Sequence, residues 1–254
     1  MPNKLSELEL QVAELQEALA ESEKDRSALL KTVSHDIKAP LNQLFALSSL
    51  LRMTSENLTE EQVDYVNRMD MVAKEGLNLI RNLVDLRTID YRGIQYREDK
   101  INVEEILKET INHLSPAAGR KEVIIIQETQ PARTILDKIY VGRIFDHLIS
   151  NAIKFAPPGS TVYVNMLVIG RQIQVRIVDE GKGIPEKEAN SLFKRFIVLS
   201  PRPTAGESTT GLGLYLAKAM AEGLQGNVNY IADTSRTIFE VTLPMHNDLI
   251  AKPV

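Results

Sequence analysis

The chain has 254 residues, of which 43% are apolar, and this is enough to form two modest domains. A balance of 30 basic against 34 acidic residues gives a net charge of −4, which disfavours a surface for nucleic acid. The absence of cysteine excludes disulfides and thiolate chemistry, and no apolar run approaches the ~20 residues that span a bilayer. We therefore expect a cytoplasmic chain with no membrane segment and no nucleic-acid partner.

Residues 1–30 carry a heptad repeat. Its apolar positions alternate in steps of three and four, at Leu5, Leu8, Val12, Leu15 and Leu19. Acidic and basic residues fill the positions between them, so a single helix would expose a leucine stripe. The pattern predicts a parallel coiled coil, and a helix packed on its own globular domain stays open as the alternative.

Residues 31–92 are predicted to form a helical hairpin. Pro40 is expected to bend the first helix, which continues through the leucines at 41, 44, 47 and 51. Thr59 and Gln62 form a capping box for a second helix, which is predicted to run to about Ile89. Each hairpin has an apolar face too wide for one neighbour, so two copies would close a four-helix bundle.

The first helix contains the stretch SHDIKAPL, residues 34–41. His35 falls off the apolar seam and is predicted to be exposed, with Asp36 and Lys38 nearby. A neutral imidazole is a competent nucleophile, a carboxylate can fix its tautomer, and an ammonium can attract an anionic substrate. A solvated histidine without function is the alternative for these residues taken alone.

The second half of the chain has a mixed pattern after a polar linker at residues 93–100. One helix is predicted over residues 103–114, and another runs from Asp137 as its cap to about Phe155. Five strands are predicted, at KEVIIIQE, TVYVNMLV, QIQVRIVD, GNVNYIA and TIFEVTLP. These elements predict an α/β sandwich.

Polar residues and glycines gather into three stretches of this region. In HLISNAIKF, His147, Asn151 and Lys154 share one helical face that could hold a metal ion and phosphate. In DEGKGIP, Asp179 ends a strand, and Gly181 and Gly183 let the backbone approach a ligand. In TTGLGL, Gly211 and Gly213 precede a helix whose N-terminus favours phosphate.

Taken in order, these stretches resemble the catalytic core of a two-component sensor histidine kinase. SHDIKAPL is similar to the phosphoacceptor box, HLISNAIKF to the asparagine box, and DEGKGIP and TTGLGL to the two glycine boxes. LFKRF, residues 192–196, is similar to the phenylalanine box of the family. The resemblance implies a dimeric four-helix bundle with an N-terminal coiled coil, followed by a Bergerat-type ATP-binding domain of the gyrase, Hsp90, histidine-kinase and MutL superfamily.

The resemblance also implies roles for single residues. His35 would accept phosphate from ATP, with Asp36 as base or orienting partner and Lys38 beside them. Asn151, together with His147, would hold Mg²⁺, and Lys154 would contact phosphate. Asp179 would recognise the adenine amine. The remaining nucleotide-binding residues implied are Phe155, Gly181, Gly183, Arg195, Gly211, Leu212 and Gly213, and the loop between Ile197 and Thr210 would be the ATP lid.

The implied organisation has five parts: a coiled coil (1–30), a dimerisation and phosphotransfer domain (31–92), a linker (93–100), an ATP-binding domain (101–246) and a tail (247–254). The phosphoryl group would pass to an aspartate of a response-regulator receiver domain. The chain would act in the cytoplasm, alone or as part of a longer membrane-bound sensor.

Two departures from the family pattern leave alternatives open. Ala39 stands where most members carry threonine or asparagine, which predicts weak phosphatase activity toward the regulator. His147 stands where members usually carry asparagine. A dimeric signalling scaffold with a degenerate nucleotide site, or another ATPase of the superfamily, are the alternative functions.

Overall fold

The computed structural model describes residues 12, 22, 32–34, 36–53, 58–92, 96–204, 207, 209–233 and 235–246. The chain divides into two compact units, Met1–Arg92 and Gly93–Val254. Most of the predicted coiled coil, the phosphoacceptor candidate His35 and the tail at 247–254 lie outside the described residues.

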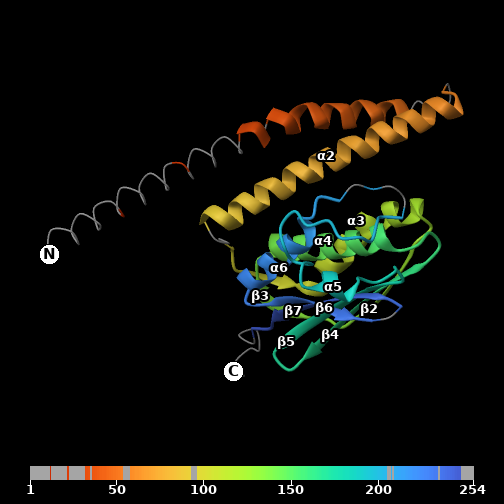
Figure 1. Ribbon diagram of the computed structural model, residues 1–254. Helices are drawn as coiled ribbons and strands as arrows, with labels where there is room; N and C mark the ends of the chain where they lie inside the picture. Colours follow the sequence, from red (N-terminus) through yellow and green to blue (C-terminus); the bar gives the residue numbers. More distant parts are fainter. Residues whose placement is uncertain are drawn as a thin grey trace, which may run out of the picture. The chain divides into compact units, whose positions relative to one another are not determined.

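The first unit contains a helical hairpin, drawn in orange and yellow in Figure 1. Its first helix includes residues 36–53, and its second, α2, runs from Glu60 to Arg92. The capping box is confirmed: the Thr59 N–H donates to Gln62 Oε1 at 2.9 Å, and the Gln62 N–H donates to Thr59 Oγ1 at 3.2 Å. Two otherwise orphan donors at the start of α2 are satisfied in this way.

The hairpin encloses a narrow core that includes polar groups. Val66, Ala73 and Ile80 of α2 are buried, together with Ser48 and Asp70. The Ser48 hydroxyl lies 3.3 Å from Asp70 Oδ1, so a hydrogen bond links the two helices. None of the helices in the described part of the chain has the length and apolar character that crossing a bilayer needs.

The second unit is built on a five-stranded sheet of order β2-β4-β5-β7-β6. β2 pairs with β4 in parallel, and every other neighbouring pair is antiparallel. The strands are β2 (Ile124–Thr129), β4 (Thr161–Ile169), β5 (Gln172–Asp179), β6 (Asn227–Ala232) and β7 (Thr237–Pro244). All five predicted strands are therefore present.

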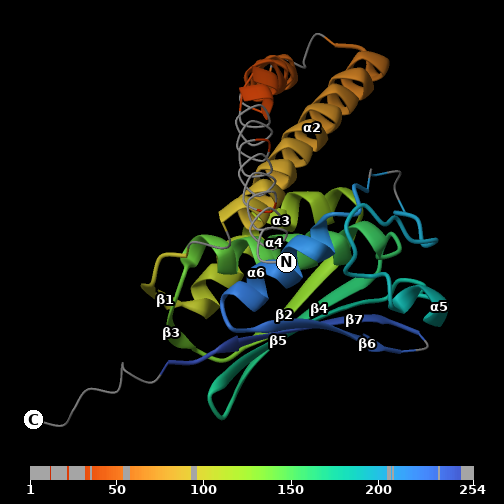
Figure 2. The ribbon, with the colours of Figure 1, turned by 60° about the vertical axis from the view of Figure 1, so that its left-hand side comes forward.

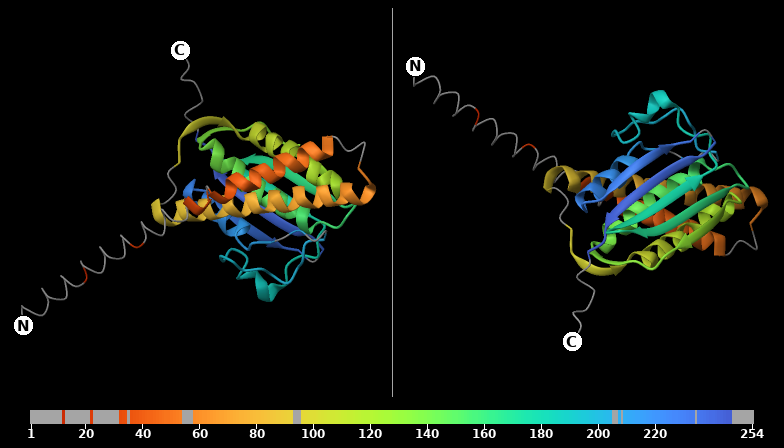
Figure 3. Two further views of the ribbon diagram at one scale, coloured as in Figure 1. Left: turned by 90° about the horizontal axis from the view of Figure 1, so that it is seen from above. Right: turned by 90° about the horizontal axis from the view of Figure 1, so that it is seen from below.

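Three helices cover one face of this sheet (Figure 2), and the other face is seen in the right-hand view of Figure 3. They are α3 (Val103–Arg120), α4 (Lys138–Phe155) and α6 (Gly213–Gly223). Burial alternates strictly along β7, as expected for a strand with one packed face. The core between the layers includes Phe145 and Phe239, both fully buried. A helical hairpin followed by an α/β sandwich confirms the predicted fold class.

Several elements differ from the prediction. The first helix of this unit was expected to end at residue 114, but α3 continues to Arg120 with Pro116 inside it. Proline removes one helical N–H, and here the Ser115 hydroxyl donates to the Ile111 carbonyl at 2.8 Å within the same turns. His113 is accordingly a mid-helix residue and not part of a helix end.

Three short elements were not predicted. β1 (Asp99–Asn102) and β3 (Arg133–Leu136) form a separate two-stranded antiparallel sheet, and α5 (Glu186–Ala189) is a single turn. β1 begins inside the stretch predicted as linker. Four-residue strands are too short to show a period of two, so the sequence offered no pattern for them.

Candidate functional site

The helix α4 carries the amide and imidazole of the predicted metal site. Asp137 caps it, since its Oδ1 accepts from the N–H groups of Ile139 at 2.8 Å and Tyr140 at 3.1 Å. One side of α4, including Leu148 and Ala152, is fully buried in the core. His147 and Asn151 lie one turn apart and are half-buried, as is Lys154.

The carboxylate at the end of β5 lies deep in the domain. Asp179 is only 1% exposed, and its Oδ1 accepts from the Gly181 N–H at 2.9 Å. Burial raises the pKa of this carboxyl from 3.8 to about 6, although hydrogen bonds from Gly181 and the Thr237 hydroxyl and the positive charge of Lys121 act in the opposite direction. A carboxylate held in this way is a ready acceptor for a buried amine.

Gly181 brings this carboxylate to the end of α4. A Cβ placed on Gly181 would lie 2.5 Å from Asp179 Oδ1 and 3.1 Å from the Phe155 carbonyl oxygen, so a side chain there would displace the carboxylate. Gly183 has a φ of +67°, a conformation that favours glycine. The structure thus brings Asp179 and Gly181, from DEGKGIP, close to Phe155, from HLISNAIKF.

The start of α6 approaches α4 from another direction. An ideal Cβ on Gly213 would lie 3.7 Å from His147 Nδ1, which places the imidazole beside the first turn of α6. Leu212 is buried, and its N–H donates to Thr210 Oγ1 at 3.3 Å. The N-terminus of α6 and the polar face of α4 therefore border the same region.

The loop between α5 and α6 is closed at its base. The Phe196 N–H donates to the Gly211 carbonyl at 2.9 Å, and a Cβ on Gly211 would lie 2.6 Å from the Ile197 carbonyl oxygen. Gly211 has a φ of +66°, and Phe196 also adopts a positive φ of +60°. We call this contact of residues 196–197 with Gly211 the loop neck.

Arg195 lies beside the loop neck and is held by an aromatic ring. Its guanidinium carbon lies 4.5 Å from the ring centroid of Tyr215 on α6, and it also donates a hydrogen bond to the Tyr215 hydroxyl. The side chain is exposed. Arg195 is thus held against Tyr215 in the first turn of α6.

Asp36 and Lys38 lie on the first helix of the hairpin, and both are exposed. The chemistry assigned to them depends on His35, which is outside the described residues.

Sequence reasoning missed two residues that contact this site. Thr237 pairs with Asp179 across β5 and β7, which places its hydroxyl beside the carboxylate. Lys121, at the end of α3, extends to the last turn of α4, where its Nζ donates to the carbonyls of Ile153 and Lys154. The pairing of the two predicted strands could have suggested Thr237, but nothing local to Lys121 could have indicated its partners.

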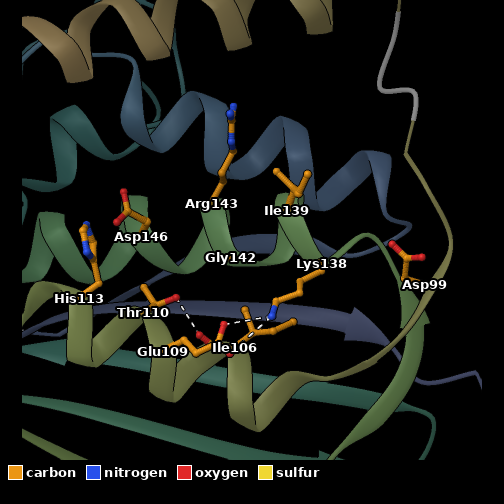
Figure 4. A pocket seen from close by; sticks show the side chains of 10 residues that line it. All are labelled: Asp99, Ile106, Glu109, Thr110, His113, Lys138, Ile139, Gly142, Arg143 and Asp146. Carbon is orange, nitrogen blue, oxygen red and sulfur yellow. Dashed lines mark hydrogen bonds and ion pairs between the residues drawn. The ribbon is translucent and has the colours of Figure 1, made fainter. Parts of the chain in front are cut away.

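A separate groove of about 510 Å³ lies between α3 and α4 (Figure 4). His113, Glu109 and Lys138 are among its lining residues, and Lys138 forms an ion pair with Glu109 at 3.2 Å. None of the predicted nucleotide or metal residues lines this groove.

Two family models match the chain. The model described as histidine kinase-, DNA gyrase B-, and HSP90-like ATPase matches residues 136–247, and the His Kinase A (phospho-acceptor) domain matches residues 25–92. The two matches together include all five sequence boxes.

Curated relatives match most of this chain but only part of their own length. Sensor histidine kinase GacS of Pseudomonas protegens is 29% identical over 88% of this chain and 25% of its own sequence. Heme sensor protein HssS of Staphylococcus aureus is 26% identical over 95% of this chain and 52% of its own. The chain therefore spans between a quarter and about half of these relatives.

Solved structures share the fold. The full-length ShkA structure in complex with AMPPNP matches with a TM-score of 0.64 and 22% identity, over 86% of this chain and 46% of that one. The Acinetobacter baumannii histidine kinase AdeS matches with a TM-score of 0.59 and 18% identity, over 82% and 96%.

Proposed function

Since the chain belongs to the two-component histidine kinases and carries their phospho-acceptor and ATPase domains, we propose that it phosphorylates His35 from ATP and passes the phosphoryl group to a receiver-domain aspartate. The observation that carries this proposal is the convergence of two segments, the end of β5 and the start of α6, on α4. Gly181 brings Asp179 to Phe155, and Gly213 lies beside His147. This arrangement supports a site in which the Asp179 carboxylate recognises the base and the N-terminus of α6 binds phosphate, both beside the polar face of α4.

The proposed nucleotide contacts follow from the chemistry of each group. Asp179 accepts a hydrogen bond from the adenine amine, and Gly181 and Gly183 let the base approach the backbone. The N–H groups of the first turn of α6, which begins at Gly213, favour phosphate oxygens, and Gly211 and Leu212 lead the chain into this turn. Lys154 adds a positive charge, and Arg195 adds a second one at the loop neck.

The donor set on α4 suits a divalent cation bound together with the nucleotide. The amide oxygen of Asn151 is a hard ligand of the kind that Mg²⁺ prefers, whereas the imidazole nitrogen of His147, one turn away, is a softer donor that Mg²⁺ favours less. Mg²⁺ takes six ligands, so phosphate oxygens and water would supply the others. When bound, the ion would neutralise charge on the phosphates.

The hairpin supplies the nucleophile in this proposal. The His35 imidazole attacks the γ-phosphorus, a P–N bond forms, the bond to the bridging oxygen of ADP breaks, and the ring proton passes to Asp36 or water. Lys38 adds positive charge for the incoming phosphates. The same phosphoryl group then moves to a carboxylate oxygen of the receiver domain, and His35 returns to its neutral state.

The hairpin also supports a homodimer. Leu44, Leu47 and Leu51 of the first helix and Met69 and Val72 of α2 are large apolar side chains that remain exposed in a single chain. A second copy would cover them and complete a four-helix bundle. We place this dimer in the cytoplasm, with a receiver-domain protein as its partner, and we expect Ala39 to leave it with weak phosphatase activity.

The decisive experiment is incubation with γ-labelled ATP and Mg²⁺, scored as acid-labile, alkali-stable label on the protein. Wild type is compared with His35→Ala, Asn151→Ala and the matched control His113→Ala, whose histidine lines the separate groove between α3 and α4. We expect label in wild type and control, and at least a hundredfold less in the other two variants. Nucleotide binding without label in wild type would favour the scaffold function instead.

A further inference from the structure

Lys121 is a buried cation at the junction of α3 and α4. Its side chain is 5% exposed, yet it keeps a full set of acceptors. Its Nζ donates to the Ile153 carbonyl at 2.7 Å and to the Lys154 carbonyl at 2.6 Å. The last carbonyls of a helix lack intrahelical donors and lie at its negative end, so an ammonium is well placed there.

The same ammonium contacts the predicted lid. Glu207 Oε1 lies 3.3 Å from Lys121 Nζ, and the Glu207 side chain is 20% exposed. Glu207 and Lys121 are 86 positions apart in sequence, and their contact is not part of the hydrogen bonding of a helix or a sheet. The ion pair therefore fastens a loop to the body of the domain.

A second contact fastens the loop at Thr204. Its N–H donates to the Lys154 carbonyl at 3.1 Å, and its hydroxyl donates to the Ala156 carbonyl at 2.7 Å. The Lys154 carbonyl thus accepts from both Lys121 and Thr204. We call the contacts of Thr204, Glu207 and Lys121 with the end of α4 the lid anchor.

The lid anchor lies close to the base-recognising carboxylate. The positive charge of Lys121 is one of the influences that lower the pKa of Asp179 against the effect of burial. The lid anchor bonds to the carbonyls of Lys154 and Ala156. The residue between them, Phe155, has the carbonyl that lies near Gly181. Residues 154–156, at the end of α4, therefore contact both the lid and the segment that carries Asp179.

We propose that Lys121 is a positioning residue that fastens the nucleotide lid, through Glu207, to the end of α4 and so slows the departure of bound nucleotide. The inference rests on the proposed function, because it assumes that the region bordered by Asp179, α4 and α6 holds ATP. The alternative is that Lys121 only caps α4 and that Glu207 contributes nothing. The two differ in what happens when Glu207 alone is changed.

The first test needs no nucleotide. Hydrogen exchange at the Thr204 amide is measured in the nucleotide-free full chain, for wild type, Glu207→Gln and the control Glu240→Gln. Glu240 is comparably shielded, 13% exposed, and pairs with Arg176 on the sheet at 2.7 Å. We expect about three- to tenfold faster exchange at Thr204 in Glu207→Gln and no change there in the control. Equal exchange in all three proteins would overturn the lid anchor.

The second test measures the dissociation rate of a fluorescent ADP analogue by stopped flow. We expect it to rise about three- to tenfold in Glu207→Gln, with the association rate and the stability of the ATP domain unchanged. Lys121→Arg should keep the slow rate, because a guanidinium retains the charge, whereas Lys121→Met should give the fast one. An unchanged rate in Glu207→Gln would overturn the proposal.

The two tests separate this inference from the proposed function. If wild type binds no nucleotide, the proposed function fails, and the exchange measurement still decides whether Glu207 fastens the loop. If wild type binds nucleotide and Glu207→Gln behaves like Glu240→Gln in both measurements, only the role of Lys121 and Glu207 is wrong.

Discussion

The two units of this chain differ in how they bury apolar residues. The ATP-binding unit closes its own core: Phe145, Phe239 and Ile177 are fully buried between helices and sheet. Among its described residues, the hairpin buries few large side chains and leaves Leu47 and Leu50 each 59% exposed. The ATP-binding unit is thus self-contained, whereas the phospho-acceptor unit leaves large apolar side chains exposed, which the proposed dimer would cover.

The strongest way to test this contrast is to open the core of the ATP-binding unit. Phe239→Ala should lower its free energy of unfolding by about 3–5 kcal/mol, since a buried ring is replaced by a cavity. Chemical denaturation followed by circular dichroism measures this. Ile169→Ala on β4, where the side chain is 54% exposed, is the matched control and should change the value by less than about 1 kcal/mol. Equal effects would contradict the self-contained core.

A charge on the exposed apolar face should separate the hairpins. Leu47→Glu would place a carboxylate in the proposed dimer interface, and we expect the dimer dissociation constant to rise about a hundredfold. Analytical ultracentrifugation of the full chain measures this change. Asn67→Glu introduces the same charge on α2, about 200° around the helix from Tyr65 and Met69, and should leave the dimer intact. A dimer unaffected by Leu47→Glu would show that this face has another role.

Asp179→Asn should raise the stability of the ATP-binding unit while it weakens nucleotide binding. The pKa of Asp179 is raised on folding, so the folded protein binds the carboxyl proton more tightly than the unfolded chain does. The stability that this protonation gives the folded state is lost as the pH rises through about 6. At pH 7.5 the free energy of unfolding of the variant should be about 2–3 kcal/mol higher than that of wild type. This difference should shrink toward pH 4. Urea denaturation at both pH values measures it.

The same variant should bind ADP at least about tenfold more weakly, because an amide accepts the adenine amine less well than a carboxylate. Wild-type affinity should also fall more steeply than that of Asp179→Asn between pH 7 and 5, as the carboxylate gains a proton. Titration of the ADP phosphate is common to both proteins, so the difference between the two profiles reports Asp179. Unchanged affinity in the variant would place the base elsewhere.

The smallest expected effect concerns the polar part of the hairpin. Ser48→Ala removes the hydroxyl that contacts Asp70 and the Phe45 carbonyl, and it should lower hairpin stability by about 1 kcal/mol. Lys74 and Arg52 still pair with Asp70, which limits the loss. Thermal denaturation at fixed protein concentration measures it, with Ser49→Ala as the neighbouring control. A loss as large as that of Phe239→Ala would show that this polar contact controls the whole bundle.

The family and the fold class were predicted from sequence because five boxes occur in order and because the long elements have local signals. The cap at Asp137 and the Thr59–Gln62 box each depend on residues at most three positions apart, so the sequence could predict them. The structure confirms both. The close approach of Asp179 to the Phe155 carbonyl at the end of α4 depends on Gly181, which is distant in sequence from Phe155. The sequence indicated that Gly181 permits close approach but not what it approaches.

Other features were beyond sequence reasoning for physical reasons. The run of α3 past Pro116 depends on tertiary packing, since Ala118 is buried and local propensity alone favours an earlier end. The contacts of Lys121 join residues 32, 33 and 86 positions apart, and no periodicity encodes such distances. Arg195 was expected near phosphate, and only the structure reveals its ring partner, Tyr215.

The loop neck has a consequence for how this protein can change. Because Phe196 and Gly211 hold the two ends of the loop together, the chain between them closes a ring whose entry and exit are fixed. Doubling the length of such a ring costs only about 0.6 kcal/mol in closure entropy. The loop is thus a natural site for insertions, where evolution or a protein engineer could add a recognition peptide while α6 keeps its place.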